Sequence, residues 1–288
     1  MKSFVFSPNT PGKLVTILLM VFVLFFATLC EAQEVIQPLK YNTQLMYEKT
    51  KDFGTRDIGE SRDTLCLPFF DDFSNTNIFL DANGTECGDT VFNKNKSQIY
   101  PNSLFWMDSS AFVNTTYPIE PPTIGVATLD GLKKNGRPHN FAGYGIADHL
   151  TSKPIRLGGA LADTVYLTFY YQPGGNGDYP NDADSLILEF KNASNEWKSV
   201  WSVTDETGAQ IDSFKIAAVP VIDAQYLYDG FQFRFTNYAT RTGNNDHWHI
   251  DYVLLDDDRT ANDTLFRDVA FMEMPTTILR NYQQMPWN

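Results

Sequence analysis

Basic residues are scarce in this chain. Its 22 lysines and arginines stand against 35 aspartates and glutamates, which gives a formal net charge of −13 at pH 7. A chain this acidic repels phosphate backbones, and no basic stripe interrupts it. The composition therefore argues against nucleic acid as a partner.

Sequence signatures of enzymes are also missing. The chain has no Gly-x-Ser-x-Gly nucleophile elbow and no Gly-Lys-Ser/Thr after a glycine loop. The glycine-rich stretch 174–179 precedes no predicted helix, so it indicates a strand connection and not a phosphate cradle. Glycosidases need two carboxylates about 5–10 Å apart, whereas the predicted strands carry isolated acids such as Glu189. We predict no catalytic activity.

Long apolar runs are limited to residues 14–29, which follow a segment whose charged residues are Lys2 and Lys13. A basic flank, an apolar core and small residues after it are typical of a secretory signal peptide, and we expect cleavage after Ala32. The run is short for a bilayer-spanning helix, which needs roughly 20 residues. An uncleaved anchor is one alternative. A lipoprotein acylated at Cys30 is the other, but the small residue that normally precedes such a cysteine is missing.

Cysteine is rare, with three residues in the whole chain. Cleavage of the signal would remove Cys30 and leave Cys66 and Cys87. An even pair in an exported chain is typical of a disulfide, and two buried free thiols are the alternative.

The chain divides into four parts. Residues 1–32 form the predicted signal peptide helix, and 33–62 are a polar, irregular leader without a sustained period. Residues 63–258 form the body, and 259–288 are a C-terminal extension with one weak strand at 265–272. The body is long enough to bury the core of one large sandwich.

Alternating apolar residues run through the body. In 164–171, 185–190 and 230–236, every second residue is aliphatic or aromatic, which predicts strands with one buried face. Further predicted strands are 124–129, 197–203, 214–221 and 247–255. Many short strands without helical crossovers predict an all-β fold of antiparallel sheets, a β-sandwich or jelly roll.

Short aromatic and acidic motifs occur in a recognisable order. They are Phe-Asp-Asp-Phe-Ser at 70–74, Phe-Trp-Met-Asp at 105–108, the Tyr-rich strand 164–171, the Phe-rich strand 231–235 and His-Ile-Asp-Tyr-Val at 249–253. Over about residues 65–258 this order resembles the concanavalin-like jelly roll of MAM-type and cleaved-adhesin-type domains of secreted Bacteroidota proteins. Relatives of this kind often end in a sorting domain for type IX secretion. No such sorting domain follows residue 258. This argues against display on the cell surface, or indicates that the chain is a fragment of a longer protein.

The resemblance implies a calcium ion that ties the first strand to the last. The matching acids are Asp71, Asp72 and Asp251, with Asp246 as a further candidate. Calcium takes six or more hard oxygen ligands, which carboxylates and loop carbonyls supply. The alternative is that these acids cap turns or pair with arginines.

A second metal hypothesis concerns His247, His249 and Asp251, which project to one face if the segment is a strand. Two imidazoles and a carboxylate are suitable ligands for zinc or iron. Same-face residues lie about 7 Å apart along a strand, however, so an ordinary hydrogen-bonded row is the favoured interpretation.

Aromatic residues make up 14% of the chain, and most of them must be core. Those nearest predicted turns could instead stack on sugar rings, because an aromatic face offers flat apolar area. These candidates are Trp106, Tyr170, Tyr179 and Trp248.

Together these features predict an exported binding or adhesion module without catalytic activity, which recognises a protein or a carbohydrate. We expect it in the periplasm, on the outer-membrane surface or outside the cell, without a transmembrane segment once the signal is removed. A structural component of the envelope and an accessory module of a larger secreted hydrolase are the alternatives.

Overall fold

The computed structural model describes residues 40–51, 64–74, 99–103, 105–139, 143–160, 163–204 and 213–263. All of them belong to one compact unit, Pro38–Asn288. The predicted signal peptide, the weak strand at 265–272 and Cys87 lie outside the described residues. Cys66 is disulfide-bonded. No helix among the described residues has both the length and the apolar character needed to cross a bilayer.

Two antiparallel sheets form a β-sandwich, as predicted. The first has the order β10-β7-β12-β4-β3, and β1 also pairs with β12. The bounds of its strands are β1 Phe69–Asp71, β3 Phe112–Asn114, β4 Val126–Leu129, β7 Tyr166–Pro173, β10 Lys215–Pro220 and β12 Trp248–Asp256. β1 pairs with the C-terminal half of β12, and β4 pairs with its N-terminal half.

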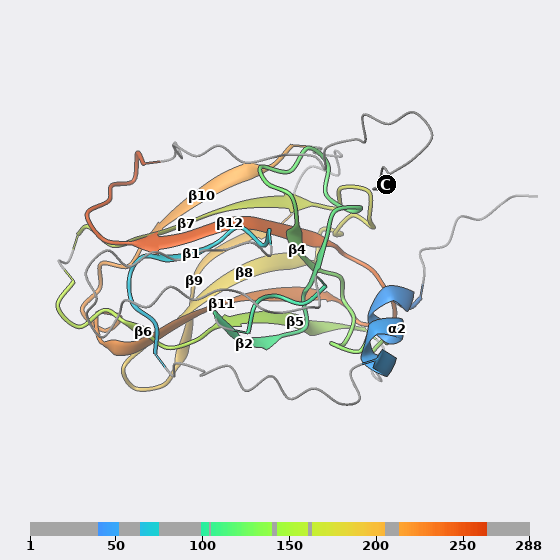
Figure 1. The fold of residues 1–288 in the computed structure, drawn as a ribbon, viewed down its shortest axis with the longest axis horizontal. Coiled ribbons are helices and arrows are strands. Elements are labelled where there is room, and N and C mark those ends of the chain that lie inside the picture. The colour runs from blue at the N-terminus through green and yellow to red at the C-terminus, as the bar shows by residue number, and fades with distance from the viewer. Residues whose placement is uncertain are drawn as a thin grey trace, which may run out of the picture. The chain divides into compact units, whose positions relative to one another are not determined.

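The second sheet has the order β2-β5-β11-β8-β9, and β6 pairs with β11. Its strands are β2 Trp106–Ser109, β5 Tyr144–Ser152, β6 Ile155–Arg156, β8 Ser185–Lys191, β9 Trp197–Thr204 and β11 Asp229–Thr240. Figure 1 shows the labelled strands of the first sheet above those of the second.

The core lies between the sheets and is built from the alternating residues of each strand. In β8 every second residue is buried, and in β7 and β11 the inward residues alternate with outward ones, some of which are themselves buried. Buried residues from β7, β8 and β11 that share this core include Leu167, Phe169, Leu186, Leu188, Phe190, Phe231, Phe233 and Phe235. The alternation predicted from the sequence is confirmed at all three strands.

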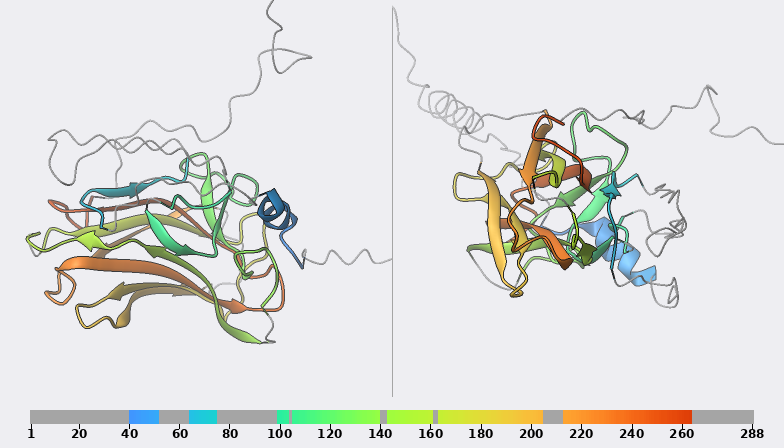
Figure 2. Two further views of the ribbon diagram at one scale, coloured as in Figure 1. Left: turned by 60° about the horizontal axis from the view of Figure 1, so that its bottom comes forward. Right: turned by 90° about the vertical axis from the view of Figure 1, so that its left-hand side faces the viewer.

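A short helix breaks the predicted irregular leader. Helix α2, Thr43–Lys51, begins after Asn42, whose Oδ1 accepts a hydrogen bond from Leu45 N at 3.2 Å. This is an N-cap. Leu45 is 1% exposed and packs with Phe112 of β3. Figures 1 and 2 show α2 in blue at one end of the sandwich. The prediction of an irregular segment is therefore wrong for residues 43–51.

The end of β1 approaches the start of β4 closely. Gly125 has φ +96°, and a Cβ added there would lie 2.5 Å from the carbonyl oxygen of Phe73. Only glycine fits this approach, because another residue would bring both backbone strain and a clash. This contact positions Asp71 and Asp72 beside the segment before β4.

Candidate ligand-binding face

The outer face of the second sheet carries polar side chains in a regular grid. Because the phenylalanines of β11 point inward, Gln232, Arg234 and Thr236 point outward. Arg234 lies opposite Thr151 of β5 and Glu189 of β8 in the register. Residues paired in this way have their side chains on the same face.

A charged cluster occupies the middle of this face. Arg234 Nε lies 2.6 Å from Glu189 Oε2, and Thr236 Oγ1 donates to the same oxygen at 2.8 Å. His149 Nδ1 lies 3.1 Å from Thr236 Oγ1. Burial alone would raise the pKa of Glu189, but the hydrogen bonds from Arg234 and Thr236 outweigh it, so this pKa is lowered. Glu189 is therefore an ionised acceptor that holds Arg234 in place.

Trp197 lies beside this cluster at the start of β9. The guanidinium carbon of Arg234 lies 4.3 Å from the centre of the Trp197 ring, and Lys191 Nζ lies 5.9 Å from it. A cation over an indole face is attracted by the ring quadrupole. Lys191 Nζ also donates to Gln232 Oε1 at 3.1 Å. The half-buried Trp197 thus lies among polar side chains of the neighbouring strands.

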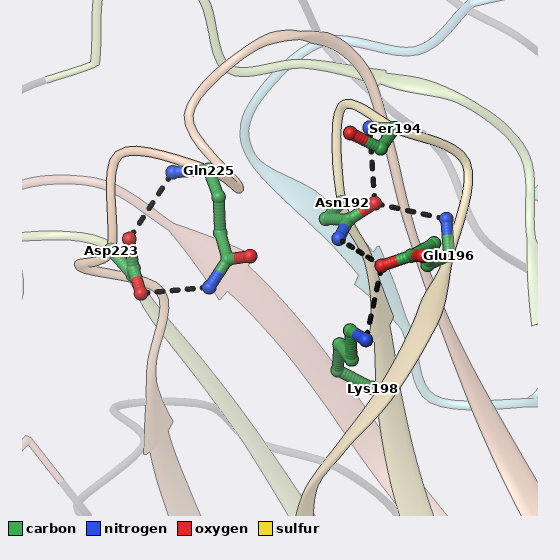
Figure 3. Close-up of polar contacts among 6 residues, drawn as sticks. All are labelled: Asn192, Ser194, Glu196, Lys198, Asp223 and Gln225. Carbon is green, nitrogen blue, oxygen red and sulfur yellow. Dashed lines mark hydrogen bonds and ion pairs between the residues drawn. The ribbon is translucent and has the colours of Figure 1, made fainter.

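The β8–β9 hairpin turn sets the position of Trp197. Asn192 Oδ1 accepts hydrogen bonds from Ser194 N at 3.0 Å and Glu196 N at 2.9 Å. Glu196 Oε2 in turn lies 3.0 Å from Lys198 Nζ. Figure 3 shows these contacts, with the neighbouring turn at Asp223 and Gln225 beside them. Because the turn is closed by its own side chains, the register that follows it is well defined.

Exposed apolar side chains flank the polar cluster. Ile146 is 50% exposed and lies opposite Tyr238, which is 37% exposed, while Tyr144 at the start of β5 is 51% exposed. Met107 of β2 is 60% exposed and lies beside Gln232. The face therefore combines exposed aromatic and aliphatic surface with fixed hydrogen-bonding groups, which is the composition of a ligand-binding surface.

The outer face of the first sheet is covered at one end. Gln172 of β7 is fully buried, and its side-chain amide exchanges hydrogen bonds with the backbone of Ile119 at 2.9 and 2.8 Å. Asn176 N donates to Tyr117 O at 2.7 Å. The segment that contains Tyr117 and Ile119 thus lies against this sheet, whereas on the other sheet the side chains of Arg234 and Glu189 remain partly exposed, at 20% and 16%.

The four acids predicted to bind calcium do not form one group. Asp71 Oδ2 accepts from Trp106 Nε1 at 2.7 Å, and Asp72 Oδ1 accepts from Ser74 N at 3.0 Å. Asp246 precedes β12, whereas Asp251 lies within that strand, with the strand residues 248–250 before it. Within the described part of the chain, no three His, Cys, Asp or Glu residues are placed to hold one metal ion. A calcium ion shared by Asp71, Asp72 and Asp251 stays a prediction.

Asp251 is fully buried and held by Thr123. Its carboxylate accepts hydrogen bonds from Thr123 N at 3.0 Å, from Thr123 Oγ1 at 3.0 Å and from Tyr252 N at 2.7 Å. The pKa of Asp251 is raised to about 8, chiefly by burial and to a smaller extent by the nearby charge of Asp72, against the effect of these bonds. Asp251 and Asp72 are thus the pair that the structure brings together from the predicted set.

The histidine row is built as a hydrogen-bonded network. His249 is fully buried, with Nδ1 2.8 Å from Thr128 Oγ1 and Nε2 3.0 Å from Gly174 O. His247 Nδ1 accepts from Asp178 N at 2.9 Å. Burial lowers the pKa of His247 to about 3 and that of His249 to about 4, so both rings are neutral. The three groups have separate partners, which favours the non-metal interpretation.

The predicted sugar-stacking residues are mostly core. Trp106 is 3% exposed and Trp248 is fully buried, so neither ring presents a face to a ligand and the prediction is wrong for both. Both tryptophans lie on strands, at positions whose side chains point into the core. The sequence shows that they are near turns, but it does not show which face of the strand they occupy. Tyr170 and Tyr179 are half-buried, and Tyr170 lies edge-on to Tyr252 at 6.4 Å.

Sequence reasoning did not identify Trp197 and Arg234 as site residues. One signal was present, because the alternation that puts three phenylalanines of β11 inward also puts Gln232, Arg234 and Thr236 outward. The position of Trp197 beside Arg234 depends on the register between β8, β9 and β11, which the local sequence does not specify.

No protein-family model matches the sequence, and no curated protein sequence is similar to it. Among solved structures, the chain is similar to the K1 cleaved adhesin domain of Lys-gingipain from Porphyromonas gingivalis, with 11% identity and a TM-score of 0.35 over 66% of this chain and 98% of that one. It is also similar to the CBM27-1 module from Caldicellulosiruptor saccharolyticus in complex with mannohexaose, with 11% identity and a TM-score of 0.36 over 52% and 84%. A cellulose-specific carbohydrate-binding module, CBM28, matches with 13% identity and a TM-score of 0.32 over 51% and 81%. The likeness is one of β-sandwich architecture.

Proposed function

We propose that the protein is an exported, non-catalytic binding module that takes a carbohydrate on the outer face of its second sheet. The cluster of Trp197, Arg234 and Glu189 on an accessible sheet face carries this proposal. Export rests on the signal-like residues 14–29.

A sugar ring has an apolar face and a rim of hydroxyl groups. An indole ring provides flat apolar area for the face, while charged and amide side chains provide bonds to the rim. Trp197 is bordered by Arg234, Lys191 and, through Lys191, Gln232. All four side chains are mounted on strands, which hold a binding geometry more tightly than loops do.

The test is binding of the protein to an array of soluble and insoluble polysaccharides. We expect Trp197→Ala to weaken binding to any retained polysaccharide at least tenfold, because it removes the stacking surface. Affinity electrophoresis or calorimetry with the same polysaccharide measures the change.

Lys198→Ala is the matched control. Lys198 is the next residue on β9 and its side chain is 51% exposed, but its partner is Glu196 and not the cluster. The control should bind as the native protein does. Equal binding by Trp197→Ala would contradict the proposed site, and a protein retained by no polysaccharide would favour a structural role in the envelope.

A further inference from the structure

Two fully buried carboxyl groups meet at one end of the sandwich. Asp184 directly precedes β8, Asp246 lies just before β12, and both are 0% exposed. Asn181 bonds to both of them: its backbone N donates to Asp184 Oδ2 at 2.8 Å, and its Nδ2 donates to Asp246 Oδ1 at 3.1 Å. This end of the molecule therefore holds two acids beside one amide.

The donors around this pair do not satisfy it. Thr240 N donates to Asp246 Oδ2 at 2.8 Å, but within the described part of the chain no N–H or hydroxyl group donates to the buried Asp184 Oδ1, and the carboxyl group of Asp246 is the polar group that Asp184 meets. A third acid, Asp178, accepts from Asp246 N at 3.3 Å. In the part of the chain that the structure describes, no lysine or arginine is paired with Asp184 or Asp246. Burial of a carboxylate oxygen without a hydrogen-bond donor costs free energy, and a bound cation would offset that cost.

Electrostatics agree with this geometry. The pKa of Asp246 is raised to about 7, chiefly by burial, with further contributions from the charge of Asp184 and from a hydrogen bond with its carboxyl group. Burial also raises the pKa of Asp178, again with a contribution from the charge of Asp184. The three acids therefore repel one another in a desolvated environment.

We propose that Asp184 and Asp246 hold one divalent cation of the calcium type. Two carboxylates balance its charge, and hard oxygen ligands are those that calcium prefers. Asn181 Nδ2 faces Asp246 here. A rotation of the amide by 180° would exchange the positions of its nitrogen and oxygen, and Oδ1 would then be a further ligand for the cation. Water and backbone carbonyls complete calcium sites of this kind.

The site would join both sheets. Asp184 leads into β8, and Asp246 Oδ2 holds Thr240 at the end of β11, both in the second sheet, while Asp246 itself leads into β12 of the first. Asn237 of β11 also donates to Asp246 O at 3.1 Å. A bound cation would thus fix the end of β11 beyond Tyr238. The site is separate from the proposed carbohydrate face and from Asp71, Asp72 and Asp251.

The experiment is calcium titration of the chelator-treated protein by calorimetry, with thermal melting in parallel. Asp184→Asn and Asp246→Asn are the test variants, and Asp182→Asn, exposed in the same loop, is the matched control. We expect calcium to raise the Tm of the native protein and of Asp182→Asn by the same amount. Each test variant should lose the shift and bind calcium at least tenfold more weakly.

The metal-free state shows whether a test variant still folds. Asp184→Asn removes one of two repelling charges, so its Tm in chelator should equal or exceed that of the native protein. A native protein with no calcium response, in which the pair shares a proton instead, would overturn the proposal. So would test variants that keep the response while Asp251→Asn loses it, because the ion would then lie at Asp251.

Discussion

Trp106 lies in the core, and its indole N–H donates a hydrogen bond to Asp71 Oδ2 at 2.7 Å. Its ring packs edge-on against Phe69 and Phe233, with centroids 5.3 and 5.8 Å away, and it stacks on Phe73 at 5.9 Å. The carboxylate of Asp71 is buried as well, and it also accepts from Phe73 N at 3.0 Å. The side chain of Trp106 therefore both packs in the hydrophobic core and donates a hydrogen bond to the buried carboxyl group of Asp71.

Trp106→Phe should destabilise the protein by about 2–4 kcal/mol, because it removes a donor from a buried carboxylate and leaves a small cavity. Trp248→Phe is the matched control. Trp248 is equally buried, but its Nε1 has no hydrogen-bond partner among the described residues, so phenylalanine there removes the same ring volume and no bond. Urea denaturation of both variants measures the difference. Equal losses would show that the bond to Asp71 contributes nothing.

At the scale of elements, alternation or a local enrichment in β-branched and aromatic residues predicted β4 and β7 to β12 from the sequence, whereas β5 was not predicted. β7 and β8 present one apolar face, and β11 does so from Phe231 to Phe235. β5 does not, because its buried residues include Asp148, and its outward residues include the exposed Tyr144 and Ile146. A mixed pattern of this kind becomes a strand only through pairing with β11.

Helix α2 was missed for a related reason. Its nine residues are too few for a helix to be stable by itself, and its order comes from contacts far along the chain. Asn42 N donates to Gly136 O at 3.0 Å, and Asn42 Nδ2 donates to Asp130 Oδ2 at 3.4 Å. Leu45 supplies the buried apolar contact. Local propensity contains none of this information.

Leu45→Ala should therefore undock α2 and destabilise the protein by about 2–4 kcal/mol, since it deletes a buried side chain. Gln44→Ala, one residue earlier on the exposed side of the helix, should change stability by less than about 0.5 kcal/mol. Amide hydrogen exchange of residues 43–47 should rise in the first variant only. Unchanged exchange in Leu45→Ala would mean that the helix is held by Asn42 alone.

At the scale of the whole molecule, the buried ionisable groups act on stability in opposite directions. His247 and His249 have pKa values lowered to about 3 and 4, below the value of about 6.5 for an unfolded histidine. The unfolded chain therefore binds more protons between about pH 4 and 6.5, and stability rises with pH across that interval. An unfolded histidine is half protonated at pH 6.5, so this contribution ends only above about pH 7.5, where the histidines are neutral in both states.

Asp251 acts in the opposite sense, and its effect extends to higher pH. Its pKa is about 8 in the folded protein and about 3.9 in an unfolded chain. The folded state therefore binds the extra proton between those values. The stabilisation is complete below about pH 4 and is lost as pH rises toward 8. Above about pH 7.5, where histidines no longer contribute, buried carboxyl groups with raised pKa values make stability fall as pH rises.

In chelator, the free energy of unfolding should therefore fall from about pH 7.5 to 8.5, with up to about 1.4 kcal/mol per pH unit contributed by Asp251 while it stays protonated in the folded state. Asp251→Asn cannot release this proton, so its stability should fall less steeply, whereas Asp182→Asn, at an exposed acid, should keep the native slope. Urea midpoints at half-unit pH intervals give both slopes. A native protein whose stability is flat or rising over this interval would mean that Asp251 is ionised throughout, and that Thr123 and Tyr252 compensate its burial by hydrogen bonding alone.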